Sequence, residues 1–214
     1  MTAESDRGYW NRHAQNYGRS MRLLGRPIPR MCELASEAVA GHDRVLEIAA
    51  GTGVVTDALA RRARRVIATD YAPAMVSVLS ERCKALGLSN VEVEQADLFA
   101  LRFETGTFDS VVAANVLHLV PDPSAALTEL RRVLRPGGTL VVPTFCHGEG
   151  LVAAGLSRML GLTGFPIHTR FTARAFRAAV VEAGLLIRRS ETLAGPIPIE
   201  YVEGVPPPSR AEPS

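Results

Sequence analysis

Hydrophobic and polar positions follow two different periods along this chain. Short runs of aliphatic and β-branched residues alternate with longer stretches in which apolar residues recur every three or four positions. The short runs predict strands and the longer stretches predict amphipathic helices, because side chains alternate along a strand and repeat about every 3.6 residues along a helix. The chain is therefore expected to alternate between strands and helices.

The predicted elements occur in regular order. Strands are predicted at 44–50, 65–70, 90–97, 108–116 and 139–145, and helices at 54–63, 73–87, 123–134 and 171–184. The sequence RPGG is expected to break the third of these helices, and Gly184 to cap the fourth. Two later runs, LLIRRSETLAG and IPIEYVEG, are expected to close the sheet as a hairpin-like pair.

This alternation predicts the fold class. The first strand is almost entirely apolar, as expected for a strand buried on both faces of a sheet. Strands and helices alternating at this spacing indicate parallel strands joined by right-handed crossovers. We expect an α/β fold, with a doubly wound, mostly parallel, Rossmann-like sheet and helices on both faces.

A chain of 214 residues suits one domain with its own core. We expect this domain to span residues 41–203, with a variable apolar substrate segment at 148–168. Residues 1–40 are expected to form a helical N-terminal lid. Residues 204–214, GVPPPSRAEPS, are expected to be a disordered tail.

Composition narrows the function. With 24 Lys and Arg against 22 Asp and Glu, the net charge of +2 gives no electrostatic argument for nucleic acid. The arginines at 61–65 lie at a predicted helix end, where positive charge suits the dipole. Three distant cysteines without a CxxC motif indicate reduced thiols in a cytoplasmic protein. No signal peptide and no apolar run of about 20 residues is found, so no transmembrane segment is expected.

The stretch VLEIAAGTG, residues 45–53, puts a glycine turn directly after the first strand. Ligands of open α/β sheets bind beyond the carboxyl ends of strands, and small residues there let a ligand approach the backbone. The third glycine of the dinucleotide fingerprint is missing, because Thr56 takes its place. Glu47, inside the apolar strand, needs a partner: a cation, backbone N–H groups, or a ligand with an ammonium group.

VLEIAAGTG resembles the first motif of the class I S-adenosylmethionine-dependent methyltransferases. Four further blocks follow in the order of that family: VIATDYAPAMV, VEQADLFALRF, FDSVVAANVLHLVPDP and LRPGGTLVV. The resemblance covers roughly residues 45–145 and is to the small type 11, or UbiE-like, branch. Glu47 replaces the commoner aspartate and Ala49 the usual glycine, which leaves the tightness of the first loop in question.

The resemblance implies S-adenosylmethionine as cofactor and S-adenosylhomocysteine as product. It implies that Asp70 accepts hydrogen bonds from the ribose hydroxyls and Asp97 from the adenine amine, and that the Leu98 backbone N–H meets a ring nitrogen. Carboxylates at strand ends suit those donors, and Met75, Leu98 and Leu117 are candidate apolar covers for adenine. The expected cofactor residues are Glu47, Ala49, Gly51, Gly53, Asp70, Tyr71, Met75, Asp97, Leu98, Asn115 and Tyr17.

Methyl transfer needs positioning more than catalytic groups, and a general base only where the acceptor arrives protonated. His118, after the fourth strand, is the candidate catalytic residue, with a packing role as the alternative. Cys146 and His147 are adjacent on an extended chain and point opposite ways, so they are unsuited to a nucleophilic pair. No metal site is expected.

Two segments are expected to shape the acceptor site. The N-terminal aromatic residues either cover the cofactor or pack on the domain. Segment 148–168, whose longer side chains are apolar except Glu149, Arg158 and His168, is expected to wall an acceptor pocket or touch a membrane surface, with core packing as the alternative. The candidate substrate-pocket residues are Tyr9, His147, Met159 and Phe165.

The predicted function is methyl transfer from S-adenosylmethionine to a small apolar or amphiphilic acceptor, such as a quinone, lipid, phenolic metabolite or thiol. Two alternatives stay open: an NAD(P)-dependent oxidoreductase on the same kind of sheet, and a non-catalytic nucleoside-binding partner subunit. The expected partner is a small molecule, without nucleic acid, and with peripheral membrane contact left open. The protein is expected to be a monomer or homodimer.

Overall fold

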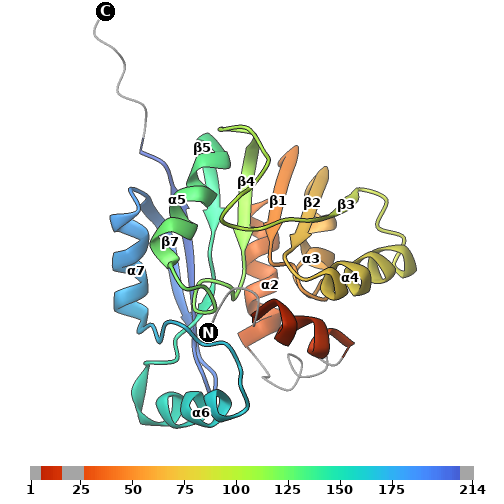
Figure 1. Cartoon of the computed structure of the whole chain (residues 1–214). Coiled ribbons are helices and arrows are strands. Elements are labelled where there is room, and N and C mark those ends of the chain that lie inside the picture. Colours follow the sequence, from red (N-terminus) through yellow and green to blue (C-terminus); the bar gives the residue numbers. More distant parts are fainter. Residues whose placement is uncertain (1–5, 16–26, 208–214) are drawn as a thin grey trace, which may run out of the picture.

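The computed structural model describes residues 6–15 and 27–207 (Figure 1). The strands are β1 (Arg44–Ile48), β2 (Arg65–Asp70), β3 (Val91–Gln95), β4 (Phe108–Ala113), β5 (Leu134–Val141), β6 (Thr144–Phe145), β7 (Leu186–Leu193) and β8 (Ile199–Val205). The helices are α2 (Pro27–Ala38), α3 (Thr56–Ala60), α4 (Pro73–Ala85), α5 (Pro123–Val133), α6 (Gly150–Leu162) and α7 (Ala173–Glu182), preceded by a helix over residues 6–15.

The strands form one sheet in the order β3-β2-β1-β4-β5-β8-β6, with β7 paired to β8. Strands β1 to β5 run parallel, and β8 pairs antiparallel with β5, β6 and β7. This arrangement confirms the predicted mostly parallel α/β sheet and its closing hairpin-like pair. The chain order reverses between β1 and β4, which is where open α/β sheets bind ligands.

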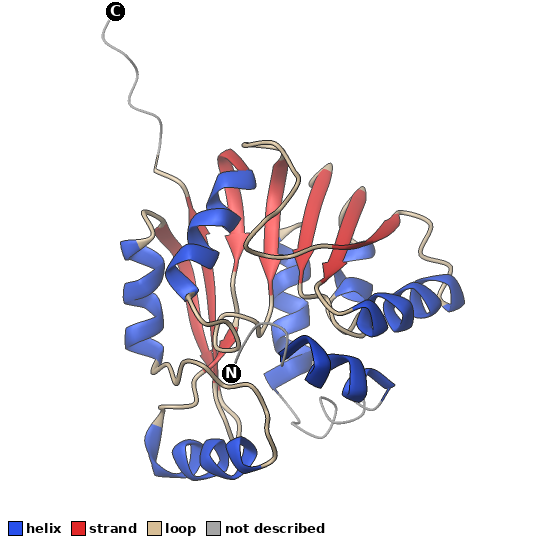
Figure 2. Ribbon diagram, viewed as in Figure 1, coloured by secondary structure: helices blue, strands red, loops and turns tan. Residues whose placement is uncertain are grey.

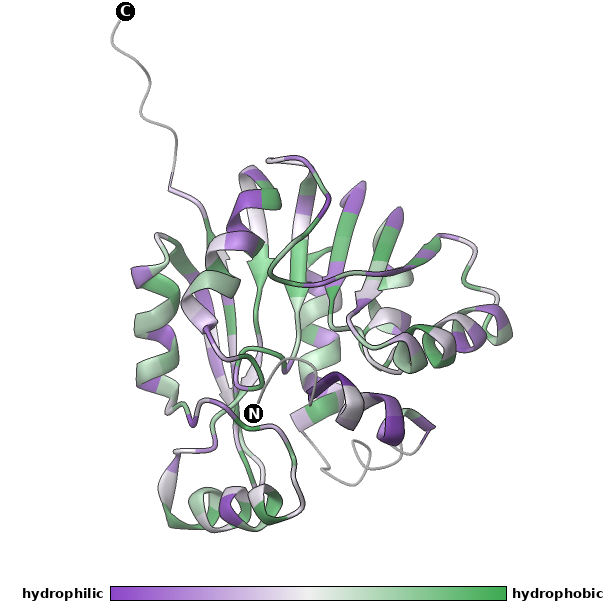
Figure 3. Cartoon of the chain, viewed as in Figure 1, coloured by the Kyte–Doolittle hydropathy of each residue, from purple (hydrophilic) through white to green (hydrophobic). Residues whose placement is uncertain are grey.

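Helices cover both faces of this sheet (Figure 2). On one face, apolar side chains of α2, α3 and α4, such as Leu34, Leu59 and Leu79, pack in one cluster with alternate strand residues. On the other face, α5 and α7 pack in a second cluster through Leu127 and Phe176. Since both faces are covered, the central strands are apolar along most of their length, as Figure 3 shows by colour.

Several predicted elements are shorter in the structure: the helix expected at 54–63 spans Thr56–Ala60, and the strand expected at 108–116 ends at Ala113. Two further corrections change the sheet itself. The fifth strand, expected at 139–145, begins at Leu134 and stops at Val141, and Thr144–Phe145 forms the separate β6. The RPGG sequence, residues 135–138, lies inside β5. Gly137 can adopt its φ of 73° because it has no side chain, and Gly138 has no room for one, since a Cβ there would lie 2.8 Å from the Asp109 carbonyl oxygen. Pro143 lies between β5 and β6 and has no N–H to donate to a neighbouring strand, which is consistent with the break in the strand there.

The second correction concerns the C-terminal tail. Strand β8 continues through Val205, and Gly204 pairs with both Leu140 and Ile187. The first residues of the expected tail therefore belong to the sheet. Residues 208–214 lie outside the described residues.

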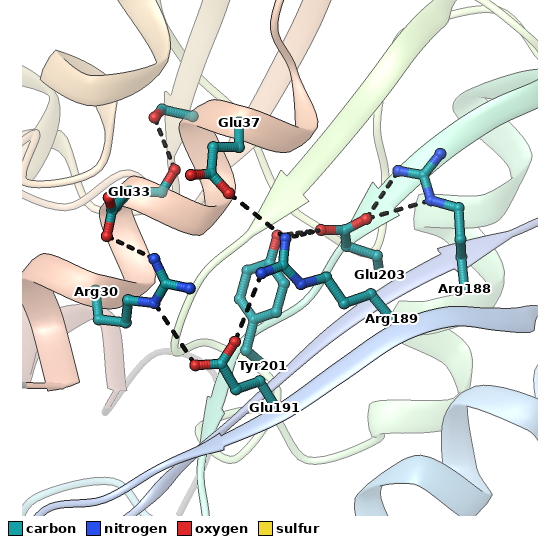
Figure 4. A network of polar contacts seen from close by, with 9 residues as sticks. Arg30, Glu33, Glu37, Arg188, Arg189, Glu191, Tyr201 and Glu203 are labelled. Atoms are coloured by element: carbon teal, nitrogen blue, oxygen red, sulfur yellow. Dashed lines mark hydrogen bonds and ion pairs between the residues drawn. The ribbon is translucent and has the colours of Figure 1, made fainter.

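A polar network ties α2 to the β7–β8 pair (Figure 4). Glu203 is almost fully buried, and it accepts hydrogen bonds from Arg188 Nη2 at 2.8 Å and from the Tyr201 hydroxyl at 2.9 Å. Arg30 and Arg189 extend the network to Glu33, Glu37 and Glu191. A buried carboxylate is tolerated only with such partners, so this network fixes α2 against the edge of the sheet.

Candidate active site

A cavity of about 220 Å³ lies at the carboxyl ends of β1, β2 and β4. One water needs about 15 Å³ of such space, so this cavity is large enough for an organic ligand. It lies at the reversal of strand order. The residues that line it are Asp6, Trp10, Ile48, Ala49, Gly51, Asp70, Tyr71, Met75, Ala96, Asp97, Leu98, Phe99, Ala114, Asn115, Val116, Leu119, Val120 and Pro121.

The backbone is strained on both sides of the reversal. Ala49 after β1 has a φ of 54°, and Asn115 after β4 has a φ of 55°. Residues with a side chain avoid this left-handed region, and such strain is typical of binding sites. Both residues line the cavity, so the two turns that carry the strain also form its wall.

Asp70 organises the first loop. Its Oδ2 accepts a hydrogen bond from the Gly51 N–H at 2.9 Å, and its Oδ1 accepts one from the Ala72 N–H at 2.9 Å. Burial raises the pKa of this carboxyl, and these backbone donors partly offset the effect. A carboxylate accepts about four hydrogen bonds, so Asp70 can hold the loop and still accept from a ligand in the cavity.

The loop after β3 is held in a similar way. Asp97 Oδ1 accepts from the Phe99 N–H at 2.9 Å, a local turn that an aspartate stabilises. Asp97 is exposed, whereas Leu98 is buried with 6% of its surface accessible. The cavity thus has a carboxylate beside an apolar side chain here, which suits a flat heterocycle with an exocyclic amine.

Two expected cofactor residues lie outside the described lining of the cavity. Gly53 has a φ of 82°, and a side chain there would meet Leu79 at 2.8 Å and Arg82 at 3.0 Å. Its role is to let α3 and α4 approach. Glu47 faces the α2–α3 side and is buried; burial raises its pKa to about 8, aided by the nearby charge of Asp57.

One buried acceptor in the cavity wall has no partner. Among the described residues, no hydrogen bond reaches Asn115 Oδ1, while Asn115 Nδ2 donates to the Met31 sulfur at 3.4 Å. A buried acceptor left unpaired is costly. A ligand ammonium group would supply the missing donor, so the cavity fits an adenosyl amino acid: acceptors at Asp70 and Asp97 for the nucleoside and at Asn115 for the amino acid.

The helix over residues 6–15 closes one side of the cavity through Asp6 and Trp10. Asn11 Oδ1 accepts from the Ala74 N–H at 3.1 Å, which caps the start of α4, where no side chain of α4 itself does so. Asp6 Oδ2 lies 2.8 Å from His168 Nε2, in the segment after α6. This pair joins the N-terminal helix to the segment between α6 and α7.

The aromatic candidates cluster beside the cavity. Tyr9 stacks on His13 with ring centroids 4.1 Å apart. Phe165 meets Tyr9 at 5.9 Å and Trp10 at 5.6 Å, both edge to face. Of these residues only Trp10 is among those that line the cavity.

His118 and His147 are packed together behind the cavity, with ring centroids 4.9 Å apart. His118 Nδ1 lies 3.1 Å from Thr144 Oγ1, and burial lowers the pKa of His118 well below its usual range. Burial lowers the pKa of His147 to about 4, and neither of its ring nitrogens has a hydrogen-bond partner among the described residues. Both imidazoles are therefore neutral near pH 7, and neither belongs to the described lining.

The structure thus brings together most of the expected cofactor residues and few of the expected acceptor residues. Met159 points outward from α6 with 66% of its surface exposed, and Tyr17 lies outside the described residues. Leu117 is fully buried, and Leu119 lines the cavity in its place. Sequence reasoning missed Asp6, whose partner His168 lies far away in the chain.

A metal site and a membrane-spanning helix were both sought among the described residues. They contain no group of three or more potential metal ligands close enough to hold an ion. No helix among them is long and apolar enough to cross a bilayer.

Comparisons with known proteins agree with this geometry. The family described as "Methyltransferase domain", type 11, matches residues 46–142. The chain is 39% identical over 147 residues to a demethylmenaquinone methyltransferase of Thermobifida fusca, covering 69% of this chain and 61% of that protein. It is 34% identical over 122 residues to a phosphatidylethanolamine N-methyltransferase of Cereibacter sphaeroides, covering 56% and 60%. The chain spans about half the length of the curated relatives it matches.

The fold is also that of a solved methyltransferase structure. An S-adenosylmethionine-dependent methyltransferase from Aquifex aeolicus superposes with a TM-score of 0.64 at 20% identity, over 80% of this chain and 87% of that one. The family match, the relatives and the fold all indicate the same class of protein. Residues 46–142 of the chain therefore belong to the type 11 methyltransferase domain family, and the fold is that of the class I S-adenosylmethionine-dependent methyltransferases.

Proposed function

We propose that this protein transfers a methyl group from S-adenosylmethionine to a small apolar or amphiphilic acceptor. The observation that carries the proposal is the set of polar groups around the cavity. Carboxylates at Asp70 and Asp97 and the unpartnered Asn115 Oδ1 surround a wall that is otherwise mostly apolar. Acceptors at these positions match the hydroxyl, amine and ammonium donors of the cofactor.

Each residue has a distinct part in holding the cofactor. Asp70 binds the ribose hydroxyls, Asp97 the adenine amine, and Leu98 and Met75 cover the ring. Tyr71 adds to the same wall and itself carries the Arg7 guanidinium 5.5 Å from its ring centroid. The cofactor supplies a methyl group on a sulfonium, which a nucleophile takes by in-line displacement. The protein contributes alignment and exclusion of water.

Where the acceptor is protonated, we propose that Asp6, rather than His118, is the general base that removes the proton. Asp6 lines the cavity and lies 2.8 Å from His168, which positions its carboxylate. His118 is buried outside the described lining, and its lowered pKa makes it a weak base. A general base must reach the proton that it removes, and Asp6 meets that condition better.

The acceptor class rests on the surroundings of the cavity. An aromatic group of Trp10, Phe165 and Tyr9 lies where the helix over residues 6–15 borders the cavity. Such rings favour an apolar or aromatic acceptor. Two relatives are named for a quinone and a lipid substrate. We propose an acceptor with one ionisable oxygen or nitrogen on an apolar body.

The proposal is tested in two steps. Calorimetry with S-adenosylmethionine and S-adenosylhomocysteine should show saturable binding, and NADH should show none; the reverse result would favour the oxidoreductase. Formation of S-adenosylhomocysteine is then followed across quinols, phospholipids, phenols and thiols. Binding of the cofactor with no turnover on any acceptor class would favour the non-catalytic partner subunit.

A further inference from the structure

Helix α6 exposes an apolar face that no described element covers. Leu151 is 93% exposed, Leu162 89%, Val152 71% and Met159 66%. At about 100° per residue these four side chains fall within one third of the helix circumference, whereas the buried residues Ala153 and Ser157 lie on the opposite side. Four such residues on 13 residues of helix form a patch rather than scattered exposures.

The segment that carries this face is positively charged, and Arg158 lies on α6 about 20° from Leu151 around the helix. Arg158, Arg170 and Arg174 are all exposed, and none of them forms an ion pair with a described residue. Arg170 contacts the other side of α6, because its Nε donates to Ser157 Oγ at 2.9 Å. From residue 150 to residue 181 the sequence contains no Asp or Glu.

The nearest acid is already engaged. Glu149, which precedes α6, accepts a hydrogen bond from the Ala173 N–H at 2.8 Å with its Oε2 and so caps α7. The exposed face therefore combines leucines and methionine with Arg158, which forms no described ion pair, at its margin and no acid on α6, which is the composition of helices that lie in the interface of an anionic bilayer.

The position of α6 agrees with that role. Figure 1 places α6 and the helix over residues 6–15 at the same edge of the molecule, beyond the carboxyl ends of the parallel strands. The cavity opens at this edge. We propose that α6 docks on a bilayer containing anionic phospholipid, with Leu151 and Leu162 among the acyl chains and Arg158 on the phosphates.

A second copy of the chain fits this face less well. In a twofold contact each patch meets its own copy, so Arg158 would lie near the same arginine of the other copy with no acid on α6 to pair with. Like charges across an interface oppose association. A bilayer of anionic lipid supplies the opposite charge instead.

The test uses the full chain without cofactor or acceptor, so its outcome is independent of the proposed reaction. Binding to vesicles of phosphatidylcholine alone and of phosphatidylcholine with phosphatidylglycerol is measured by co-sedimentation. The wild type should prefer the anionic vesicles, and added salt should weaken binding. The double variant L151E/L162E should bind at least about tenfold more weakly. Leu86→Glu, at a residue 50% exposed on the α4 side, is the matched control and should bind as the wild type does.

Leu162→Trp provides a second readout without added charge, and a blue shift of its emission with anionic vesicles is expected. The proposal is overturned if neither vesicle binds, or if L151E/L162E binds as well as Leu86→Glu. It is also overturned if light scattering shows that the wild type self-associates in solution and that L151E/L162E abolishes this, since the face then joins two copies.

Discussion

The edge of the sheet formed by β1, β2 and β4 contrasts with the region around α6, although both lie at the same end of the molecule. At the first, Asp70 and Gly51 are buried and joined by a hydrogen bond, and strained turns at Ala49 and Asn115 fix the wall. At the second, Leu151 and Leu162 are almost fully exposed and the helix contains three glycines.

This difference separates two requirements of one reaction. A nucleoside cofactor presents the same donors in every member of a family, so the residues that bind it can be rigid and interlocked. The acceptor differs from member to member, and the residues near it need only shape and polarity. Fold and cofactor therefore follow from the interlocked edge, whereas the acceptor must be inferred from the other side.

The largest effect is expected at Glu47, behind the interlocked edge. Its pKa is raised to about 8 in the folded protein, mainly by burial. The native state therefore holds this proton over a range in which the unfolded state has lost it, and stability falls as pH rises from about 4.5 to about 8. Glu47→Gln should be closest to the wild type near pH 4 and exceed it by on the order of 5 kcal/mol above pH 8. Urea unfolding at both pH values measures this; an equal pH dependence in the two proteins would refute it.

The next largest effect is expected at Asp6, which lines the cavity and also contacts His168 in the segment after α6. Asp6→Asn should lower kcat about 100-fold with an acceptor that must lose a proton, because general bases contribute at least that much. Cofactor affinity should stay near that of the wild type. His118→Gln is the control, with kcat expected within a few-fold of wild type. A loss in His118→Gln and none in Asp6→Asn would return the role to His118.

A smaller effect is expected at Asp70. Asp70→Ala removes the acceptor for the ribose and releases the Gly51 N–H, so S-adenosylmethionine should bind about 2 kcal/mol more weakly, or roughly 30-fold. Calorimetry measures the change, and circular dichroism checks the fold. Unchanged affinity would remove Asp70 from the site.

The smallest effect is expected at Ala49. Its φ of 54° is a conformation that glycine adopts without strain. Ala49→Gly should change the free energy of unfolding by no more than about 1 kcal/mol, because relief of strain is partly offset by the greater entropy of the unfolded chain. Thermal unfolding tests this; a loss of several kcal/mol would show that the methyl group packs in the loop.

The same contrast explains what the sequence predicts well. Asp70, Asp97 and Leu98 lie next to strands with a clear apolar period, so their place at the cavity follows from local pattern and parallel topology. The predicted start of strand β5 lies too far along the chain, because proline and two glycines usually mark a break between elements. In the structure Gly138 packs closely against the Asp109 carbonyl oxygen, and RPGG lies within the strand.

The acceptor side depends on contacts between distant parts of the chain. Asp6 and His168 meet across 162 positions, which no local pattern indicates. The segment at 148–168 is apolar on nearly all sides, so its periodicity did not show that Met159 would face outward. His118 follows a strand in a favourable motif, yet the packing of His147 and Phe145 against it encloses the ring.

The central claim is that the cavity at the carboxyl ends of β1, β2 and β4 binds an adenosyl sulfonium. Calorimetric titration of the folded wild type with S-adenosylmethionine, followed by displacement with S-adenosylhomocysteine, tests it most directly. The account predicts one site per chain, competition between the two ligands, and weaker binding of both to Asp70→Ala. Absence of binding to folded protein, or binding that Asp70→Ala leaves unchanged, would contradict it.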